Sequence, residues 1–179
     1  ATLTGGEYMA IDHNRQVVHI NTPYDDVIIK LNSKLNGTYI SYGSIGRQKK
    51  ELQYAQDANA AELEEVVAVK RAVSKSSRLY KNSTWDLVDA AEDDESLIAE
   101  LPQKDLPEEL QGKTESEIKA YVKQKKMERE EIQKQIQELN AKREVYIAEN
   151  QKEETGELEN AMLSAIKAQA SKKNYTWDK

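Results

Sequence analysis

The stretch from Thr114 to Glu153 constrains the fold most, because it contains neither glycine nor proline and its apolar residues recur at helical spacing. It opens with Thr-Glu-Ser-Glu, in which Thr114 and Glu117 form the capping-box pattern of a helix start. A helix over residues 115–153 would be about 57 Å long, at a rise of about 1.5 Å per residue. That length exceeds a compact domain of this size, so we expect an extended helical element.

The apolar residues of this stretch follow the alternating three- and four-residue steps of a coiled-coil seam. Charged side chains occupy some of the seam positions. The seam positions in chain order are Ile118, Val122, Lys125, Arg129, Ile132, Ile136, Leu139, Arg143 and Tyr146. Because the seam is imperfect, the sequence favours a short antiparallel hairpin over an extended parallel dimer.

A second helical pattern, from about residue 47 to 80, is the natural partner of the long helix. No glycine or proline interrupts it, so we predict one continuous helix. Its apolar stripe consists of Leu52, Ala55, Leu63, Val66, Val67, Val69 and Val73. Thr155-Gly156 then breaks the long helix, and a third helix is predicted at about 157–172. The side chains expected to pack in the seam are Leu52, Val66, Val73, Ile132, Ile136, Leu139 and Met162.

Residues 1–44 have a different pattern. Short apolar runs around residues 8–11 and 17–20 predict two strands. Thr22 and Pro23 then form the start signal of a helix, whose end is marked by Asn36-Gly37. Alternation in Thr38–Gly43 predicts a third strand. We therefore expect a small α/β segment over 1–44, followed by a helical extension over 45–179.

The connection between the two long helical patterns contains two of the three prolines. Residues of about 92–113 include Pro102 and Pro107 and predict an ordered loop rather than a helix. The expected fold class is thus mainly α with a small α/β N-terminal part. Its centre is a long antiparallel, coiled-coil-like hairpin with a third, C-terminal helix. A hydrophobic share of 38% and a charged share of 32% fit such solvated helices.

A near-repeat contains both tryptophans of the chain. Lys-Asn-Ser-Thr-Trp-Asp ends at Asp86, and Lys-Asn-Tyr-Thr-Trp-Asp ends at Asp178, so Trp85 and Trp177 each follow a predicted helix. An aromatic side chain at a helix exit commonly seals the end of a bundle, which favours a packing role. The alternative is that the two indoles together stack a ligand. Both copies also match the N-x-[ST] acceptor pattern, as does Asn36-Gly37-Thr38, but the pattern is too short to indicate a glycan.

Composition disfavours several classes of function. A net charge of -6 and a pI near 5.2 argue against nucleic acid as a partner, because phosphate binding requires a basic face. The absence of cysteine excludes disulfides, thiolate nucleophiles and thiolate metal sites. No apolar run approaches the length of a membrane span.

The sequence also offers little for catalysis or metal binding. Only His13 and His19 could supply an imidazole, and no local pattern pairs either with a nucleophile or a metal ligand. The acidic run of residues 92–95 lacks the alternating ligands and central glycine of a calcium loop. We expect a chain that is not an enzyme and that has no cofactor of its own.

The segments LTGGEYMAID and VVHINTPYDDVIIKLNSKLNGTYISYG resemble the closing part of the von Willebrand factor type A domain in a group of bacterial exported proteins. The segments KRAVSKSSRLYKNSTWDLVDA, LPEELQGKTESEI and EREEIQKQIQELNAKREVYI are similar to the charged helical tail that follows that domain. Type A domains commonly bind a divalent ion through a D-x-S-x-S loop near their start. This chain has no such loop, so the resemblance assigns no metal role to Asp12, Asp25 or Asp26, and any ion belongs to an upstream part.

The resemblance implies an adhesion or protein-interaction role and an exported location in the periplasm or cell envelope. The leading hypothesis is therefore a non-enzymatic interaction module that binds a protein partner. The alternative is a self-associating coiled coil whose imperfect seam is completed by another copy. Candidate packing or interaction residues are Trp85, Trp177, Ile132, Ile136 and Leu139.

Overall fold

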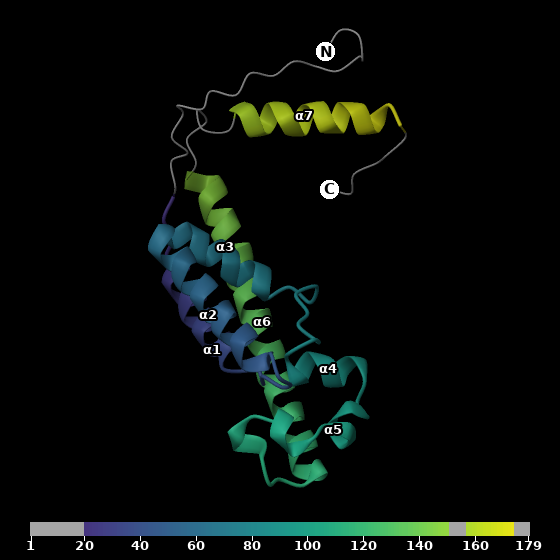
Figure 1. Cartoon of the computed structure of the whole chain (residues 1–179). Helices are drawn as coiled ribbons and strands as arrows, with labels where there is room; N and C mark the ends of the chain where they lie inside the picture. Colours follow the sequence, from purple (N-terminus) through teal and green to yellow (C-terminus); the bar gives the residue numbers. More distant parts are fainter. Residues whose placement is uncertain (1–19, 151–156, 174–179) are drawn as a thin grey trace. The chain divides into compact units, whose positions relative to one another are not determined.

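The computed structural model describes residues 20–150 and 157–173. The chain divides into two compact units, one formed by Asn21–Tyr146 and one that combines Ala1–Ile20 with Ile147–Lys179. The described residues are mainly helical, as predicted (Figure 1). The elements are α1 (Asp25–Asn36), α2 (Gly46–Leu63), α3 (Glu65–Lys75), α4 (Leu87–Asp93), α5 (Leu97–Glu100), two 3-10 turns (Gln103–Asp105 and Glu108–Leu110), α6 (Glu115–Asn150) and α7 (Glu157–Ser171).

The two predicted helix starts have different outcomes. Helix α1 begins at Asp25, two residues after the predicted first residue Pro23, and its N-cap residue is Tyr24, whose side chain forms no capping hydrogen bond. Before α1, the Thr22 hydroxyl donates to Asp25 Oδ1 at 2.8 Å and the Thr22 amide donates to Asp25 Oδ2 at 3.0 Å. At the start of α6, the Thr114 amide donates to the Glu117 carboxylate at 2.8 Å, and the Glu117 amide donates back to the Thr114 hydroxyl. The capping box is therefore confirmed, and the long helix begins where it was predicted.

The predicted α/β segment is not supported. Thr38–Gly43 is not a strand, because it forms only one antiparallel bridge, between Ser41 and Asp86, in the part of the chain that the structure describes. Its partner, the stretch that contains Trp85 and Asp86, turns at once into α4, so the ladder has no length over which to continue. The two strands predicted before residue 20 lie outside the described residues.

The tip of this extended segment is held by a glycine in the left-handed region. Gly43 has a φ of 73°, and its amide donates to the Asp105 carbonyl at 2.8 Å. A Cβ placed on Gly43 would meet no atom within 4 Å, so a side chain would affect only the backbone conformation. We expect Gly43→Ala to lower the free energy of unfolding by about 1 to 2 kcal/mol in urea titrations. An unchanged midpoint would show that the loop relaxes without cost.

The single helix predicted for residues 47–80 is wrong. Glu64 is extended, with φ -160° and ψ 149°, and it separates α2 from α3. The two helices then pack against each other, as the ion pair between Asp57 of α2 and Lys75 of α3 shows. No glycine or proline marks the break. Within one chain, the contacts between α2 and α3, including this ion pair, exist only because the chain reverses at Glu64.

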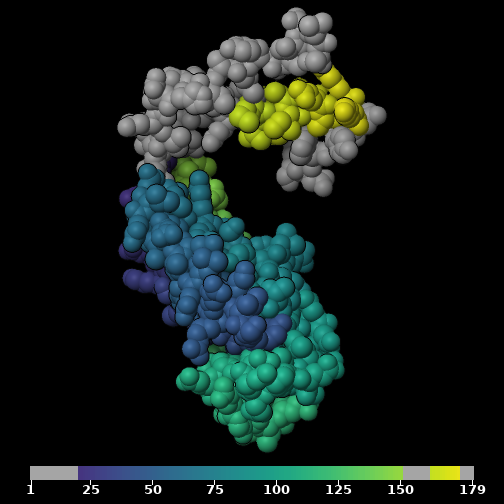
Figure 2. Space-filling model, viewed as in Figure 1, coloured from purple at the N-terminus to yellow at the C-terminus, as the bar shows by residue number. Residues whose placement is uncertain are grey.

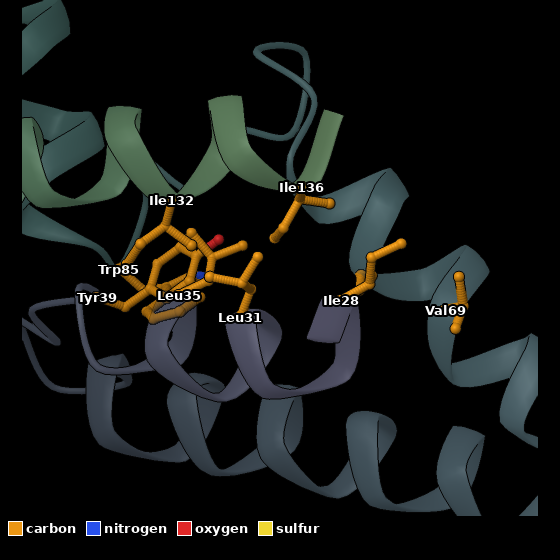
Figure 3. Packing of buried hydrophobic residues seen from close by; sticks show 9 residues of the cluster. Ile28, Leu31, Leu35, Tyr39, Val69, Trp85, Ile132 and Ile136 are labelled. Carbon is orange, nitrogen blue, oxygen red and sulfur yellow. The ribbon is translucent and has the colours of Figure 1, made fainter. Parts of the chain in front are cut away.

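The main apolar core joins α6 to α1 and α3. Ile132 and Ile136 project from α6 toward Leu31 and Leu35 of α1 (Figure 3). The buried members of this cluster are Ile28, Leu31, Leu35, Tyr39, Val69, Ala72, Trp85, Ile132 and Ile136. The expected helical packing of α6 is therefore present, but its partners are α1 and α3 rather than one long helix.

A second apolar cluster explains why the proline-containing loop is ordered. Leu106 and Leu110 of this loop are buried against Ile118 and Val122 of α6. The loop itself contains α5 and the two 3-10 turns. The second cluster consists of Ile40, Leu87, Val88, Ile98, Leu106, Leu110, Ile118 and Val122. The third predicted helix is confirmed as α7, in which Met162 is exposed rather than packed in a seam.

Candidate functional site

Trp85 is a core residue. Its side chain is 6% exposed, and its ring lies 5.7 Å from the ring of Tyr39 at an interplanar angle of 31°. This geometry agrees with the packing interpretation of the first Lys-Asn-x-Thr-Trp-Asp segment. Trp177 lies outside the described residues, so the ligand-stacking interpretation of the two tryptophans stays a prediction. Asn36, in one of the three N-x-[ST] matches, is 4% exposed and is not available to a glycan in the folded chain.

Asp86, the last residue of the first Lys-Asn-x-Thr-Trp-Asp segment, forms hydrogen bonds to three parts of the chain. Asp86 is fully buried, and its Oδ1 accepts the Ile40 amide at 2.7 Å. Its Oδ2 accepts the Asp89 amide at 3.1 Å, which caps α4, and Arg129 Nη1 at 2.7 Å. One carboxylate thus connects the extended segment, the start of α4 and the long helix. Burial raises the pKa of neighbouring Asp89, even though Arg129 acts in the opposite direction.

Two of the three charged seam positions of α6, Arg129 and Arg143, are buried in ion pairs, whereas Lys125 is half-buried and pairs with the exposed Glu128. Arg129 is 5% exposed and also lies 2.6 Å from Asp89 Oδ1. Arg143 is 4% exposed, and its Nε donates to Asp25 Oδ1 at 2.8 Å. Burial by itself would raise the pKa of Asp25, but hydrogen bonds from Thr22 and Arg143 hold it below its ordinary value. These arginines are fixed connections inside the chain rather than gaps left for a second copy.

The α6 residues proposed for packing or interaction lie in the same core. Ile136 is fully buried, Ile132 is 6% exposed, and Leu139 is half-buried against the main cluster. The α6 seam of the first unit is therefore covered by the same chain.

The side of α2 that faces the rest of the first unit is mainly polar. Lys50, Gln53, Asp57 and Ala60 follow three- and four-residue steps along the side that contacts α1 and α3. Gln53 is 5% exposed and Ala60 is 6% exposed. Neither apolar cluster found in the described part of the chain includes a residue of α2. The helix is attached by polar contacts instead.

A buried polar network provides this attachment. Asp57 Oδ2 accepts Lys75 Nζ at 2.6 Å and Asn36 Nδ2 at 2.7 Å, and Arg71 Nε donates to Asp57 Oδ1. Gln53 Nε2 donates to Asn36 Oδ1 at 3.1 Å. Burial would raise the pKa of Asp57, but hydrogen bonds from Lys75, Asn36 and Arg71 hold it below its ordinary value. Burial lowers the pKa of Lys75, although its hydrogen bond to the Asp57 carboxylate acts in the opposite direction.

The outward side of α2 carries an uncharged stripe with a leucine toward each end. Leu52 is 50% exposed and Leu63 is 72% exposed, although both were predicted to belong to a packed stripe. Figure 2 shows α2, in blue, open on the viewed surface of the first unit. The α2 stripe consists of Leu52, Ala55, Gln56, Asn59 and Leu63, which share one side of the helix and are all exposed. Sequence periodicity identified its apolar members, but the prediction that they are covered is wrong.

The charges at the ends of α2 oppose its own dipole. The first turn contains no acidic residue and the last turn no basic residue. Instead Arg47 and Lys49 lie at the positive end, where Arg47 is 3.8 Å from Glu108, and Glu62 lies near the negative end. Glu64, which follows α2, is the N-cap of α3, where a negative charge is favourable. The charges of Arg47, Lys49 and Glu62 are placed so that they destabilise an isolated helix. Among the described residues Lys49 and Glu62 form no ion pair that would compensate.

The hollows of the first unit show no evident catalytic arrangement. One of about 700 Å³ lies beside the start of α2, and no hydrogen bond joins the serine hydroxyls of its wall to a base. Another of about 290 Å³, between α4, α5 and α6, has Lys126 and Glu92 paired at 3.2 Å on its rim. No group of acidic or histidine side chains suited to a metal ion occurs in the described ranges. His13 and His19 lie outside them, so the non-enzymatic interpretation stays a prediction.

Residues 20–150 and 157–173 contain no helix that is long and apolar enough to cross a membrane. In the comparisons with known proteins, no family model, curated protein or solved structure matches the chain. The resemblance to the tail of type A proteins therefore rests on the sequence segments alone.

Proposed function

We propose that the chain is a non-enzymatic protein-interaction module that binds a helix of a partner protein along the outward face of α2. The observation that carries this proposal is the α2 stripe, in which two exposed leucines flank the uncharged side chains of Ala55, Gln56 and Asn59. Burial of these leucines against another protein would remove apolar surface from water. An exposed side without charge is also unusual in a chain with a charged share of 32%. The stripe therefore fits a docking surface.

The charges of α2 indicate what kind of helix binds there. A partner helix with an acidic residue near Lys49 and a basic residue near Glu62 would neutralise the charge that opposes the dipole at each end of α2. The sequence resemblance supports the same role, as the helical extension of an exported adhesion-type protein in the periplasm or cell envelope.

The middle of the stripe adds a second requirement on the partner. Gln56 and Asn59 present side-chain amides between the two leucines, and amides that become buried in an interface must find hydrogen-bond partners there. The partner helix should therefore carry apolar side chains toward its ends and polar, uncharged side chains at its centre. A polar pair inside an apolar seam also fixes the register of the two helices.

The absence of cysteine from the chain provides a direct test. We expect a thiol introduced by Leu52→Cys to react with a maleimide at least about tenfold more slowly in cells that make this protein than in the dilute purified chain, because a docked helix shields it. Met127→Cys is the matched control, since Met127 is an apolar residue of α6 that is 62% exposed. Equal labelling rates at position 52 in both settings would refute the docking role.

A further inference from the structure

We infer that two copies of this chain can exchange residues 21–63, and that residues 46–75 form one straight helix in the exchanged dimer. The connection between α2 and α3 carries this inference. It consists of Glu64 alone, whose backbone is extended with φ -160° and ψ 149°. Very short hinges favour the exchange of an element between copies. The inference does not rest on the docking function proposed above.

The sequence around the hinge favours the straight helix. No glycine or proline occurs between α2 and α3, and the residues from Ala60 to Glu65 are alanine, glutamate and leucine, which are strong helix formers. Among the described residues, the amides of Glu65 and Val66 donate to no protein acceptor. In a straight helix they would donate to the carbonyls four residues earlier. The local preference for a helix therefore opposes the reversal of the chain.

The contacts that hold the reversal can also form between two copies. Asp57 pairs with Arg71, and these residues lie seven positions before and seven positions after Glu64. Asp57 also pairs with Lys75 at 2.6 Å. A twofold axis at Glu64 places α2 of one straight helix along α3 of the other, so Asp57 of each copy meets Arg71 and Lys75 of its partner. One chain must reverse to form these pairs, whereas two copies form them without a reversal.

The exchanged segment has its own internal contacts and keeps its partners. Gln53 Nε2 of α2 donates to Asn36 Oδ1 of α1 at 3.1 Å, so the two helices can move together. Asp25 of α1 pairs with Arg143 of α6, and a second copy offers the same buried arginine. Exchange therefore recreates these pairs and adds the helical hydrogen bonds at the hinge. Because the buried contacts must first break, exchange should occur during folding and be slow in the folded chain.

Refolding at two protein concentrations tests whether the exchange occurs. We expect the urea-unfolded full chain to refold to a monomer at low concentration and partly to a dimer at high concentration, as measured by light scattering. After dilution the dimer should persist much longer than a dimer held by surface contacts, because its return requires residues 21–63 to detach. A chain that refolds only to a monomer at high concentration would overturn the inference.

A proline at the hinge should block the exchange. Glu65→Pro fits the reversed chain, because it replaces an amide without a partner at the first position of α3 and favours the extended backbone of Glu64. In a straight helix the same proline removes a hydrogen bond and clashes with the preceding turn. We expect it to reduce the dimer fraction at least about tenfold. Glu115→Pro, at the first position of α6, is the matched control and should leave that fraction unchanged.

Crosslinking between two variants distinguishes exchange from surface association. Gln56 Oε1 of α2 accepts Arg71 Nη2 of α3 at 3.0 Å, and the chain has no cysteine, so Gln56→Cys and Arg71→Cys each contain a single thiol. When the variants are refolded together at high concentration, a short bismaleimide should join one to the other. Variants refolded separately at low concentration and then mixed should not be joined. A dimer in which the two variants are not joined would overturn the exchange, because its α2 and α3 would still pair within each chain.

Discussion

Replacing Arg129 by alanine is expected to lower the free energy of unfolding by about 3 to 5 kcal/mol, the effect of leaving buried carboxylates without their counter-ion. Arg129 Nη1 donates to Asp86 at 2.7 Å and to Asp89 at 2.6 Å. Its Nη2 donates to the Thr38 carbonyl at 2.9 Å, and its guanidinium carbon lies 4.2 Å from the centre of the Tyr39 ring. The substitution therefore removes hydrogen bonds and stacking from three segments at once. Urea unfolding followed by circular dichroism measures the loss.

Two further variants make this prediction specific. Arg129→Lys should recover only part of the stability, because an ammonium group cannot reproduce the planar fork or the stacking on Tyr39. Lys134→Ala removes a lysine of the same helix that lies 3.9 Å from Glu138 with both side chains largely exposed, so it should change stability little. If Arg129→Ala were as mild as Lys134→Ala, the network would not be what joins α6 to α4.

The sequence predicted α6 well because its signals are local. The capping box of Thr114 and Glu117 and the steps that include Ile132 and Ile136 are features of one helix, and the structure shows both. The register even placed Arg129 on the buried side. Its role could not be predicted, because its partners Asp86 and Asp89 lie 43 and 40 residues away in the sequence. A single sequence does not show which distant acid meets which base.

The break between α2 and α3, unlike the start of α6, has no local signal in the sequence. Glu64 is an ordinary helix former, and no turn residue accompanies it. The chain reverses there because α3 then brings Lys75 and Arg71 to Asp57. The tertiary contact outweighs the helix propensity of the residues around Glu64. A prediction from local propensity therefore gives one continuous helix, which is wrong.

Periodicity in the sequence did not predict which side of α2 is buried. The pattern that includes Leu52 and Leu63 identifies one side of the helix, but it does not state what covers that side. Inside the chain, the side of α2 that faces α1 and α3 carries Gln53 and Asp57, whose hydrogen bonds have no local signature in the sequence. The leucines were therefore assigned to the core although they face outward. The candidate docking surface is identified by burial and sequence pattern together, and by neither alone.

The polar attachment of α2 leads to the second large effect. Asp57→Asn is expected to lower the free energy of unfolding at neutral pH by about 3 kcal/mol, because Lys75 is completely buried and loses its counter-ion. The asparagine side chain is similar in size, so the effect reports charge and hydrogen bonding rather than a cavity. Lys75→Met in the Asp57→Asn background should cost less than Lys75→Met alone, since it then removes an unpaired buried cation.

The pH dependence of this effect has a defined sign. The pKa of Asp57 is lower in the folded chain than in the unfolded one, so its carboxylate contributes stability fully above the unfolded value of about 3.9. That contribution is lost as the pH falls through the folded pKa. The difference in unfolding free energy between wild type and Asp57→Asn should therefore be constant from pH 7 to about 5 and shrink below pH 4. Asp93→Asn, at an exposed carboxylate paired with Lys81, should leave stability near that of wild type. A difference that stayed constant down to pH 2 would mean that the Asp57 carboxylate is not what stabilises the attachment of α2.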